Sequence, residues 1–173
     1  PEHPLVAKLL ENNPKKAELE AFCDKVRNTS DIERTSSESE KLGMYTGHDC
    51  IHPLTGEKVQ IWITNYVLVD YGTGAVMGVP SGDHRDWMFA TKYGIKKILT
   101  LQPKDKELKL EEMTDAYEEK DGVLVNSGPF TGMEMHKAVG AIIDYMEEKG
   151  LGKRRVNYRL RDWLISRQRY WGC

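Results

Sequence analysis

The sequence predicts a mixed α/β fold (α+β), in which short strands form a β-barrel-like core and helices surround it. Three observations lead to this prediction. Residues 59–79 contain three apolar runs rich in β-branched residues, and short turns separate them. Segments with helical spacing lie on both sides of this region. Strands that follow one another so closely favour a curved sheet or small barrel over alternating βαβ units.

Two helices are expected before the strands. Residues 3–10 (HPLVAKLL) form a short helix, and residues 13–28 form a longer one that begins near Pro14. Apolar residues of the longer helix recur at helical spacing and define its buried face: Leu19, Phe22, Cys23 and Val26.

The strand region begins at a turn, residues 54–58 (LTGEK), which joins two strands. The second strand alternates, so that three apolar residues share one face: Val59, Ile61 and Ile63. Residues 66–71 (YVLVDY) and 74–79 (GAVMGV) are expected to be buried strands. The glycines between them indicate a bend or a close approach of two backbone segments.

Helices and strands also follow this region. Residues 83–94 are expected to form a helix that ends at Gly94, and residues 95–101 (IKKILTL) a strand. Residues 104–122 are rich in acidic side chains and form a surface excursion.

The last predicted helix, residues 133–150, is amphipathic and ends at Gly150. One stripe of this helix is apolar: Met135, Val139, Ile142, Ile143 and Met146. Residues 155–160 are expected to form a strand, and residues 161–172 a short helix or an extended arm.

The length, composition, cysteine count and net charge of the chain limit the class of protein. The 173 residues, 39% hydrophobic and 30% charged, are typical of one globular domain. No apolar run approaches membrane-spanning length, so we expect no membrane partner. Three widely spaced cysteines argue for a reducing compartment, which is the cytoplasm or a mitochondrial or other organellar interior. The net charge of −2 argues against non-specific binding of nucleic acid over the whole surface of the protein. Residues 153–169 are nevertheless strongly basic and could contact a phosphate backbone locally.

One short stretch resembles a metal-binding pattern. GHDCIH places His48, Cys50 and His52 at alternate positions, which share a face on a strand. A structural zinc site needs a fourth ligand, usually from a second close-spaced pair, and the sequence offers none. We therefore expect no metal site.

Residues 72–86 (GTGAVMGVPSGDHRD) are the main candidate for chemistry. A dinucleotide-binding loop is disfavoured because Met77 stands at the third glycine position, and no Gly-Lys-Ser/Thr follows for a P-loop. Asp83 can cap the following helix, with Asp86 near the place that a capping box uses. Alternatively, Asp86 points into a half-apolar pocket, where a carboxylate suits the ammonium group of an amino acid. The local pattern leaves both interpretations open.

At these residues the chain resembles a known family. Residues 52–80, 71–94, 122–133 and 152–172 are similar, in the same order, to the editing domain inserted in bacterial-type leucyl-tRNA synthetases. PEHPL near the start also fits, so the resemblance covers nearly the whole chain. It implies an editing (CP1) domain at residues 1–152, and a basic segment at 153–173 that leads back to a class I catalytic domain.

The resemblance also implies a function. The parent enzyme ligates leucine to tRNA-Leu, with ATP and Mg bound in a catalytic domain outside this chain. The inserted domain hydrolyses the ester of mischarged aminoacyl-tRNA-Leu and needs no cofactor. Its partners are tRNA-Leu and the remainder of the synthetase. The implied catalytic residue is Asp86, which matches the residue that holds the α-amino group. The implied substrate-binding residues are Tyr71, Thr73, Gly74, Met77, Asp83, His84 and Arg85.

Two departures from the family pattern bear on activity. Gly82 stands where the family usually has histidine, and His84 is a candidate substitute. The family's threonine-rich segment, which forms one wall of the pocket, would lie upstream of residue 1. We therefore expect the isolated chain to hydrolyse mischarged tRNA poorly. The alternative is a non-catalytic tRNA-binding or interaction domain that has kept the editing fold.

Overall fold

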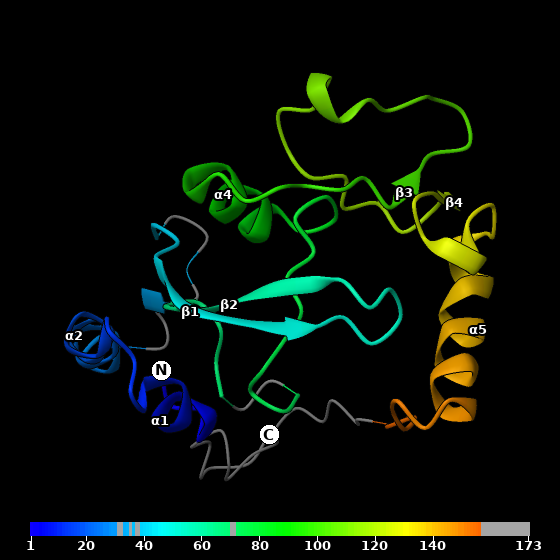
Figure 1. The fold of residues 1–173 in the computed structure, drawn as a ribbon. Helices are drawn as coiled ribbons and strands as arrows, with labels where there is room; N and C mark the ends of the chain where they lie inside the picture. The colour runs from blue at the N-terminus through cyan, green and yellow to red at the C-terminus, as the bar shows by residue number, and fades with distance from the viewer. Residues whose placement is uncertain (31–32, 35, 37–38, 70–71, 157–173) are drawn as a thin grey trace, which may run out of the picture.

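The computed structural model describes residues 1–30, 33–34, 36, 39–69 and 72–156. The named helices and strands follow in chain order (Figure 1): α1 (Leu5–Leu10), α2 (Lys16–Arg27), β1 (Gly43–Ile51), β2 (Lys58–Thr64), α4 (His84–Tyr93), β3 (Leu101–Gln102), β4 (Val123–Leu124) and α5 (Met135–Glu148). Two 3₁₀ turns, Leu110–Glu112 and Gly128–Phe130, lie between them. The mixed α/β prediction is therefore confirmed, as are the helices expected near both ends of the described chain.

A β-hairpin lies at the centre of the molecule (Figure 1). Strands β1 and β2 pair antiparallel, and the predicted turn joins them. The turn closes with a hydrogen bond from the amide of Gly56, at φ 72°, to the carbonyl of His52. A left-handed φ of this kind is accessible to glycine at little cost, which explains why the turn forms at this position.

Helices cover both faces of the hairpin at the end away from its turn. Ile63 is only 4% exposed and belongs to a core cluster with α1 and α2, formed by Val6, Leu10, Leu19 and Cys23. The preceding residue, Trp62, points to the opposite face. The centroid of its ring lies 5.3 Å from that of Phe89 and 5.0 Å from that of Tyr93, both on α4. The alternation of side chains along β2 thus places α4 opposite the first two helices.

Helix α4 begins and ends where the sequence predicts. Asp83 is the N-cap residue, and Gly94 follows the last turn at φ 64°. The amide of Gly94 donates to the carbonyl of Ala90, so the left-handed residue closes the helix. Trp87 and Phe89 are both buried, and they point in different directions: Phe89 packs on Trp62 of the hairpin, and Trp87 donates to the carbonyl of Thr114.

The predicted strands at 66–71 and 74–79 are wrong over the residues that the structure describes. Residues 66–69 and 72–79 have no strand assignment, and the described strands form two separate two-stranded sheets. Gly72 and Gly74 take left-handed φ values of 65° and 80°, which interrupt an extended backbone. The amide of Val79 donates to a side chain rather than to a neighbouring strand. A closed barrel is thus not formed by the described strands.

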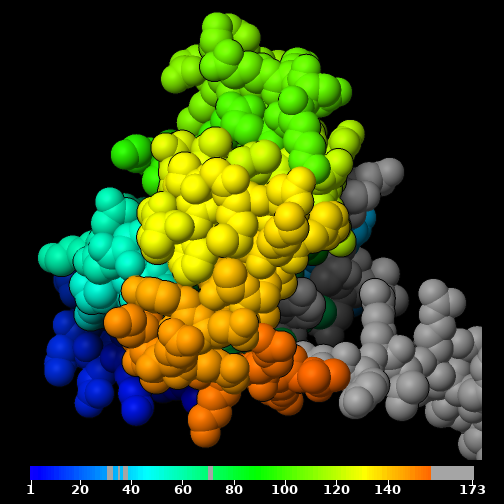
Figure 2. Space-filling model, turned by 90° about the vertical axis from the view of Figure 1, so that its right-hand side faces the viewer, coloured from blue at the N-terminus to red at the C-terminus, as the bar shows by residue number. Residues whose placement is uncertain are grey.

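The second half of the chain follows the prediction less closely. The expected strand at 95–101 shortens to Leu101–Gln102, which pairs with β4. Helix α5 is confirmed, but Val139 of its predicted buried stripe is largely exposed, and Ala138 is its buried residue. Figure 2 views the molecule from this side, with α5 (orange) at the front and the excursion (green) at the top. Within the described ranges, no helix is long and apolar enough to cross a membrane.

The expected strand at 155–160 and the arm at 161–172 fall outside the described residues, except for Arg155 and Val156, which are not in a strand.

The buried core between α2 and the hairpin yields a stability prediction. Leu19 has no exposed surface, so Leu19→Ala removes packed atoms and leaves a cavity. We expect the free energy of unfolding to fall by about 2–5 kcal/mol, measured by urea denaturation followed by circular dichroism. The matched control is Leu5→Ala on α1, where the side chain is 48% exposed and the expected loss is below about 1 kcal/mol. An equal fall in the free energy of unfolding for both variants would contradict the assignment of Leu19 to the core.

Candidate functional site

The first turn of α4 is fixed by Asp83. Its carboxylate accepts the backbone amides of Arg85 at 2.9 Å and Asp86 at 3.1 Å, as the capping hypothesis predicts. The guanidinium of Arg85 folds back onto the same carboxylate at 3.0 Å. Burial acts to raise the pKa of Asp83, but the hydrogen bonds from Arg85 and the helix amides outweigh it and lower the pKa. Arg85 is therefore committed to the cap in this structure.

The side chain of Asp86 points away from α4, toward residues 78–79 of the segment that precedes the helix. Its Oδ1 accepts a hydrogen bond from the hydroxyl of Tyr66 at 2.8 Å, and its Oδ2 accepts the backbone amide of Val79 at 2.8 Å. The residue is half-buried. Gly78 lies beside the carboxylate, since a Cβ there would stand 3.8 Å from Oδ2. Asp86 thus faces residues 72–79, the glycine-bearing segment, and its predicted role in binding an ammonium group stays a prediction.

The glycine-bearing segment carries three of the other predicted residues: Thr73, Gly74 and Met77. The imidazole of His3 accepts the amide of Leu5 at Nδ1, so its proton lies on Nε2, which donates to the carbonyl of Thr73 at 3.0 Å. Gly74 has no room for a side chain, because a Cβ would lie 2.8 Å from His3. Met77 is 58% exposed. Tyr71 lies outside the described residues, so its predicted role stays a prediction.

His84 joins the acidic excursion to the start of α4. Its Nδ1 lies 2.7 Å from the carboxylate of Asp115, and its backbone amide donates to Glu118 at 2.8 Å. The hydrogen bond with His84 lowers the pKa of Asp115. Two further bonds hold the same region: Trp87 Nε1 donates to the carbonyl of Thr114, and the amide of Tyr117 donates to the carbonyl of Ser81. In this structure His84 therefore contacts the excursion.

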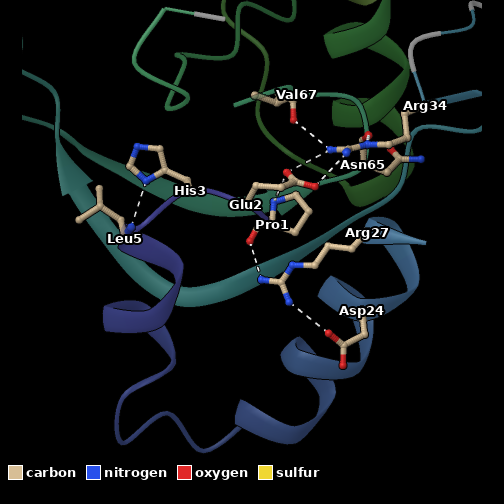
Figure 3. Close-up of polar contacts among 9 residues, drawn as sticks. All are labelled: Pro1, Glu2, His3, Leu5, Asp24, Arg27, Arg34, Asn65 and Val67. Carbon is tan, nitrogen blue, oxygen red and sulfur yellow. Dashed lines mark hydrogen bonds and ion pairs between the residues drawn. The ribbon is translucent and has the colours of Figure 1, made fainter. Parts of the chain in front are cut away.

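A buried arginine holds the segment that carries Tyr66. Figure 3 shows the guanidinium of Arg34 between the carboxylate of Glu2 and the carbonyl oxygens of Asn65 and Val67. Arg34 is 4% exposed, and its Nε lies 2.7 Å from the carbonyl oxygen of Asn65. Neither Arg34 nor Tyr66 could be recognised from the sequence, because Arg34 stands in a polar stretch and Tyr66 in an apolar run. No local signal marks either of them.

Two hollows on the described surface lie away from Asp86. One is bordered by the hairpin turn and the segments around Ile98 and Val125, and the other by the N-terminal residues, α1 and α2. Among the described residues, no group of three or more His, Cys, Asp or Glu side chains converges as metal ligands would. His52 instead uses Nδ1 to accept the amides of Leu54 and Thr55 at the turn.

The structure is similar to one part of a much larger aminoacyl-tRNA synthetase. A crystal structure of the ternary complex of the Agrobacterium radiobacter K84 agnB2 LeuRS with tRNA and LeuAMS matches it with a TM-score of 0.63 and 27% sequence identity. The match covers 94% of this chain and 16% of that chain. This likeness defines the class of the protein as a domain of a tRNA synthetase.

The particular family follows from sequence. The family model "Leucyl-tRNA synthetase, editing domain" matches residues 1–147, so the chain belongs to the leucyl-tRNA synthetase editing domain family. It is 52% identical to a leucine–tRNA ligase of Symbiobacterium thermophilum and 51% identical to that of Thermotoga maritima. Each match covers 100% of this chain and 20% or 21% of the relative, so the chain spans about a fifth of their length.

The Asp83 cap makes stability depend on pH in a defined direction. Because the pKa of Asp83 is lowered on folding, its charged form stabilises the fold above the ordinary value of 3.8, and this contribution is lost as pH falls through the folded pKa. Asp83→Asn keeps an acceptor oxygen but removes the charge. At pH 6 we expect the free energy of unfolding, measured by urea denaturation, to be about 1 kcal/mol higher for wild type than for Asp83→Asn. This difference should shrink below about pH 4. A difference that does not change with pH would contradict the assignment.

Proposed function

We propose that this chain belongs to the proofreading domain of a leucyl-tRNA synthetase, and that within the full-length synthetase it hydrolyses the ester of mischarged aminoacyl-tRNA-Leu. The observation that carries the proposal is the carboxylate of Asp86. It is half-buried, its orientation is set by two hydrogen-bond donors, and it faces a glycine-bearing segment with an exposed methionine. The family description and the relatives that share the whole length of the chain support the same function.

The proposed role of Asp86 follows from its unused acceptor capacity. A carboxylate has about four lone-pair positions on its two oxygens, and Tyr66 and Val79 use one position on each oxygen. The remaining positions are available to the α-ammonium group of the substrate. A charge-assisted hydrogen bond of this kind is roughly twice as strong as a neutral one. Asp86 would therefore hold the amino acid end of the substrate.

The hydrolysis itself needs few protein groups, because an aminoacyl ester is already activated. Water adds to the ester carbonyl, the bond to the ribose oxygen breaks, and that oxygen takes a proton, so free amino acid and uncharged tRNA result. Consistent with the resemblance, a ribose hydroxyl of the substrate assists the water. The domain contributes orientation and electrostatic stabilisation, with Thr73, Gly74, Met77 and Tyr71 as the proposed wall beside the substrate.

A separate hydrolytic site meets a physical need of leucine-specific enzymes. One methylene more or less in an apolar pocket changes binding by only about 1–3 kcal/mol, which does not exclude near-isosteric amino acids. A second site that hydrolyses the wrong product raises the accuracy. The proposed partners are accordingly tRNA-Leu and the rest of the synthetase, within the cytoplasm or an organelle. ATP and Mg would serve ligation in the catalytic domain, because hydrolysis of the ester consumes only water.

Removal of the Asp86 side chain tests the proposal. In the full-length synthetase that we propose contains this chain, Asp86→Ala should reduce deacylation of isoleucyl- or norvalyl-tRNA-Leu by at least about 100-fold, because the ammonium group loses its charged partner. Leucylation of tRNA-Leu should stay within about 2-fold of wild type, because ligation belongs to another domain.

The matched control is Asp24→Ala on α2, whose exposed carboxylate pairs with Arg27. This variant should keep both activities. Deacylation that survives in Asp86→Ala would reject the site, whereas a full-length wild-type enzyme without deacylation would favour the non-catalytic tRNA-binding alternative.

A further inference from the structure

We propose that Tyr66 is a positioning residue, which fixes the carboxylate of Asp86 in the orientation that receives the substrate's ammonium group. The inference rests on the proposed function of Asp86 and names the group that prepares it. Tyr66 belongs to the irregular segment after β2, and its hydroxyl donates to Asp86 Oδ1 at 2.8 Å. The other oxygen of Asp86 is held by the amide of Val79, so the two donors together fix the carboxylate plane.

The backbone on both sides of Tyr66 is held in place. The carbonyl oxygens of Asn65 and Val67 both accept from Arg34, at 2.7 Å and 3.4 Å (Figure 3). Asn65 is also tied to Leu42, since its amide donates to the carbonyl of Leu42 and its Oδ1 accepts the amide of Leu42. Tyr66 therefore belongs to a segment that cannot shift without breaking several part-buried hydrogen bonds.

The ring of Tyr66 is held by the same helix that carries Asp86. Its centroid lies 5.7 Å from that of Phe89, at an interplanar angle of 58°, within the range of stabilising aromatic pairs. Phe89 stands one turn after Asp86 on α4, so a displacement of the ring would also displace its contact with this helix. The hydroxyl is thus aimed at Asp86 by packing.

The chemistry of the pair makes Tyr66 a permanent donor. Burial first, and then the neighbouring Asp86 carboxylate, raise the pKa of the Tyr66 phenol, so the hydroxyl stays protonated at every physiological pH. Rotation about the last bond of an aspartate side chain has broad minima, and a carboxylate without fixed donors would turn. With Tyr66 and Val79 in place, the same lone-pair positions always face the substrate.

The variant Tyr66→Phe removes only the hydroxyl and keeps the ring packed on Phe89. In the full-length synthetase, we expect KM for deacylation of isoleucyl-tRNA-Leu to rise about 10- to 100-fold with kcat within about 3-fold, because ground state and transition state lose the same oriented ammonium contact. Leucylation should not change. In an Asp86→Ala background, Tyr66→Phe should have no further effect on residual deacylation.

The matched control is Tyr93→Phe. Tyr93 belongs to the same aromatic cluster, and its hydroxyl accepts the amide of Gly43 at 3.0 Å without contacting Asp86. This variant should keep the wild-type KM, while both tyrosine variants should shift the urea midpoint by similar amounts.

The outcomes separate the two proposals. An unchanged KM in Tyr66→Phe, with deacylation abolished by Asp86→Ala, would overturn the role of Tyr66 and leave the proposed function standing. A fall in kcat without a change in KM would also overturn it, because that result indicates loss of folded enzyme. Deacylation that survives Asp86→Ala would instead reject the proposed site itself.

Discussion

The candidate site depends on the placement of one helix end. Asp83 accepts two of the free amides at the start of α4, and Asp86, one turn further, accepts hydrogen bonds from Tyr66 and from the amide of Val79. These contacts join three separate pieces of chain: the helix, the segment after β2 and the glycine-bearing segment. Because the amides at a helix start are unsatisfied without a cap, the position of Asp83 determines where Asp86 can reach.

The hairpin gives this helix end a rigid support. One face of β2 packs on the first two helices through Ile63, and the other meets α4 through Trp62 and its neighbours Phe89 and Tyr93. Arg34 extends this support to the segment of Tyr66 by occupying the carbonyl oxygens on both sides of it. A loop-borne site thus gains the precision of regular structure, as preorganised binding requires.

The sequence allowed the prediction of α4, its cap and its glycine end, because those signals are local and have a direct physical cause. The bonds of Asp86 were not predictable, because they join residues that lie 7 and 20 positions away and show no pattern. The runs 66–71 and 74–79 resemble strands in composition, yet their described residues are irregular. The composition of these runs indicated β-structure. In the structure, Gly72 and Gly74 take left-handed φ values, and the amide of Val79 donates to the side chain of Asp86 instead of to a neighbouring strand.

The role of Asp86 is tested most directly by an experimental structure of the full-length synthetase with a non-hydrolysable isoleucyl-adenosine analogue bound in this domain. We expect the α-ammonium nitrogen at about 3 Å from Asp86, with the hydrogen bonds from Tyr66 and Val79 to the same carboxylate retained. An analogue bound with its ammonium on another residue, or an Asp86 carboxylate rotated away from Tyr66, would show that Asp86 does not hold the substrate in this way.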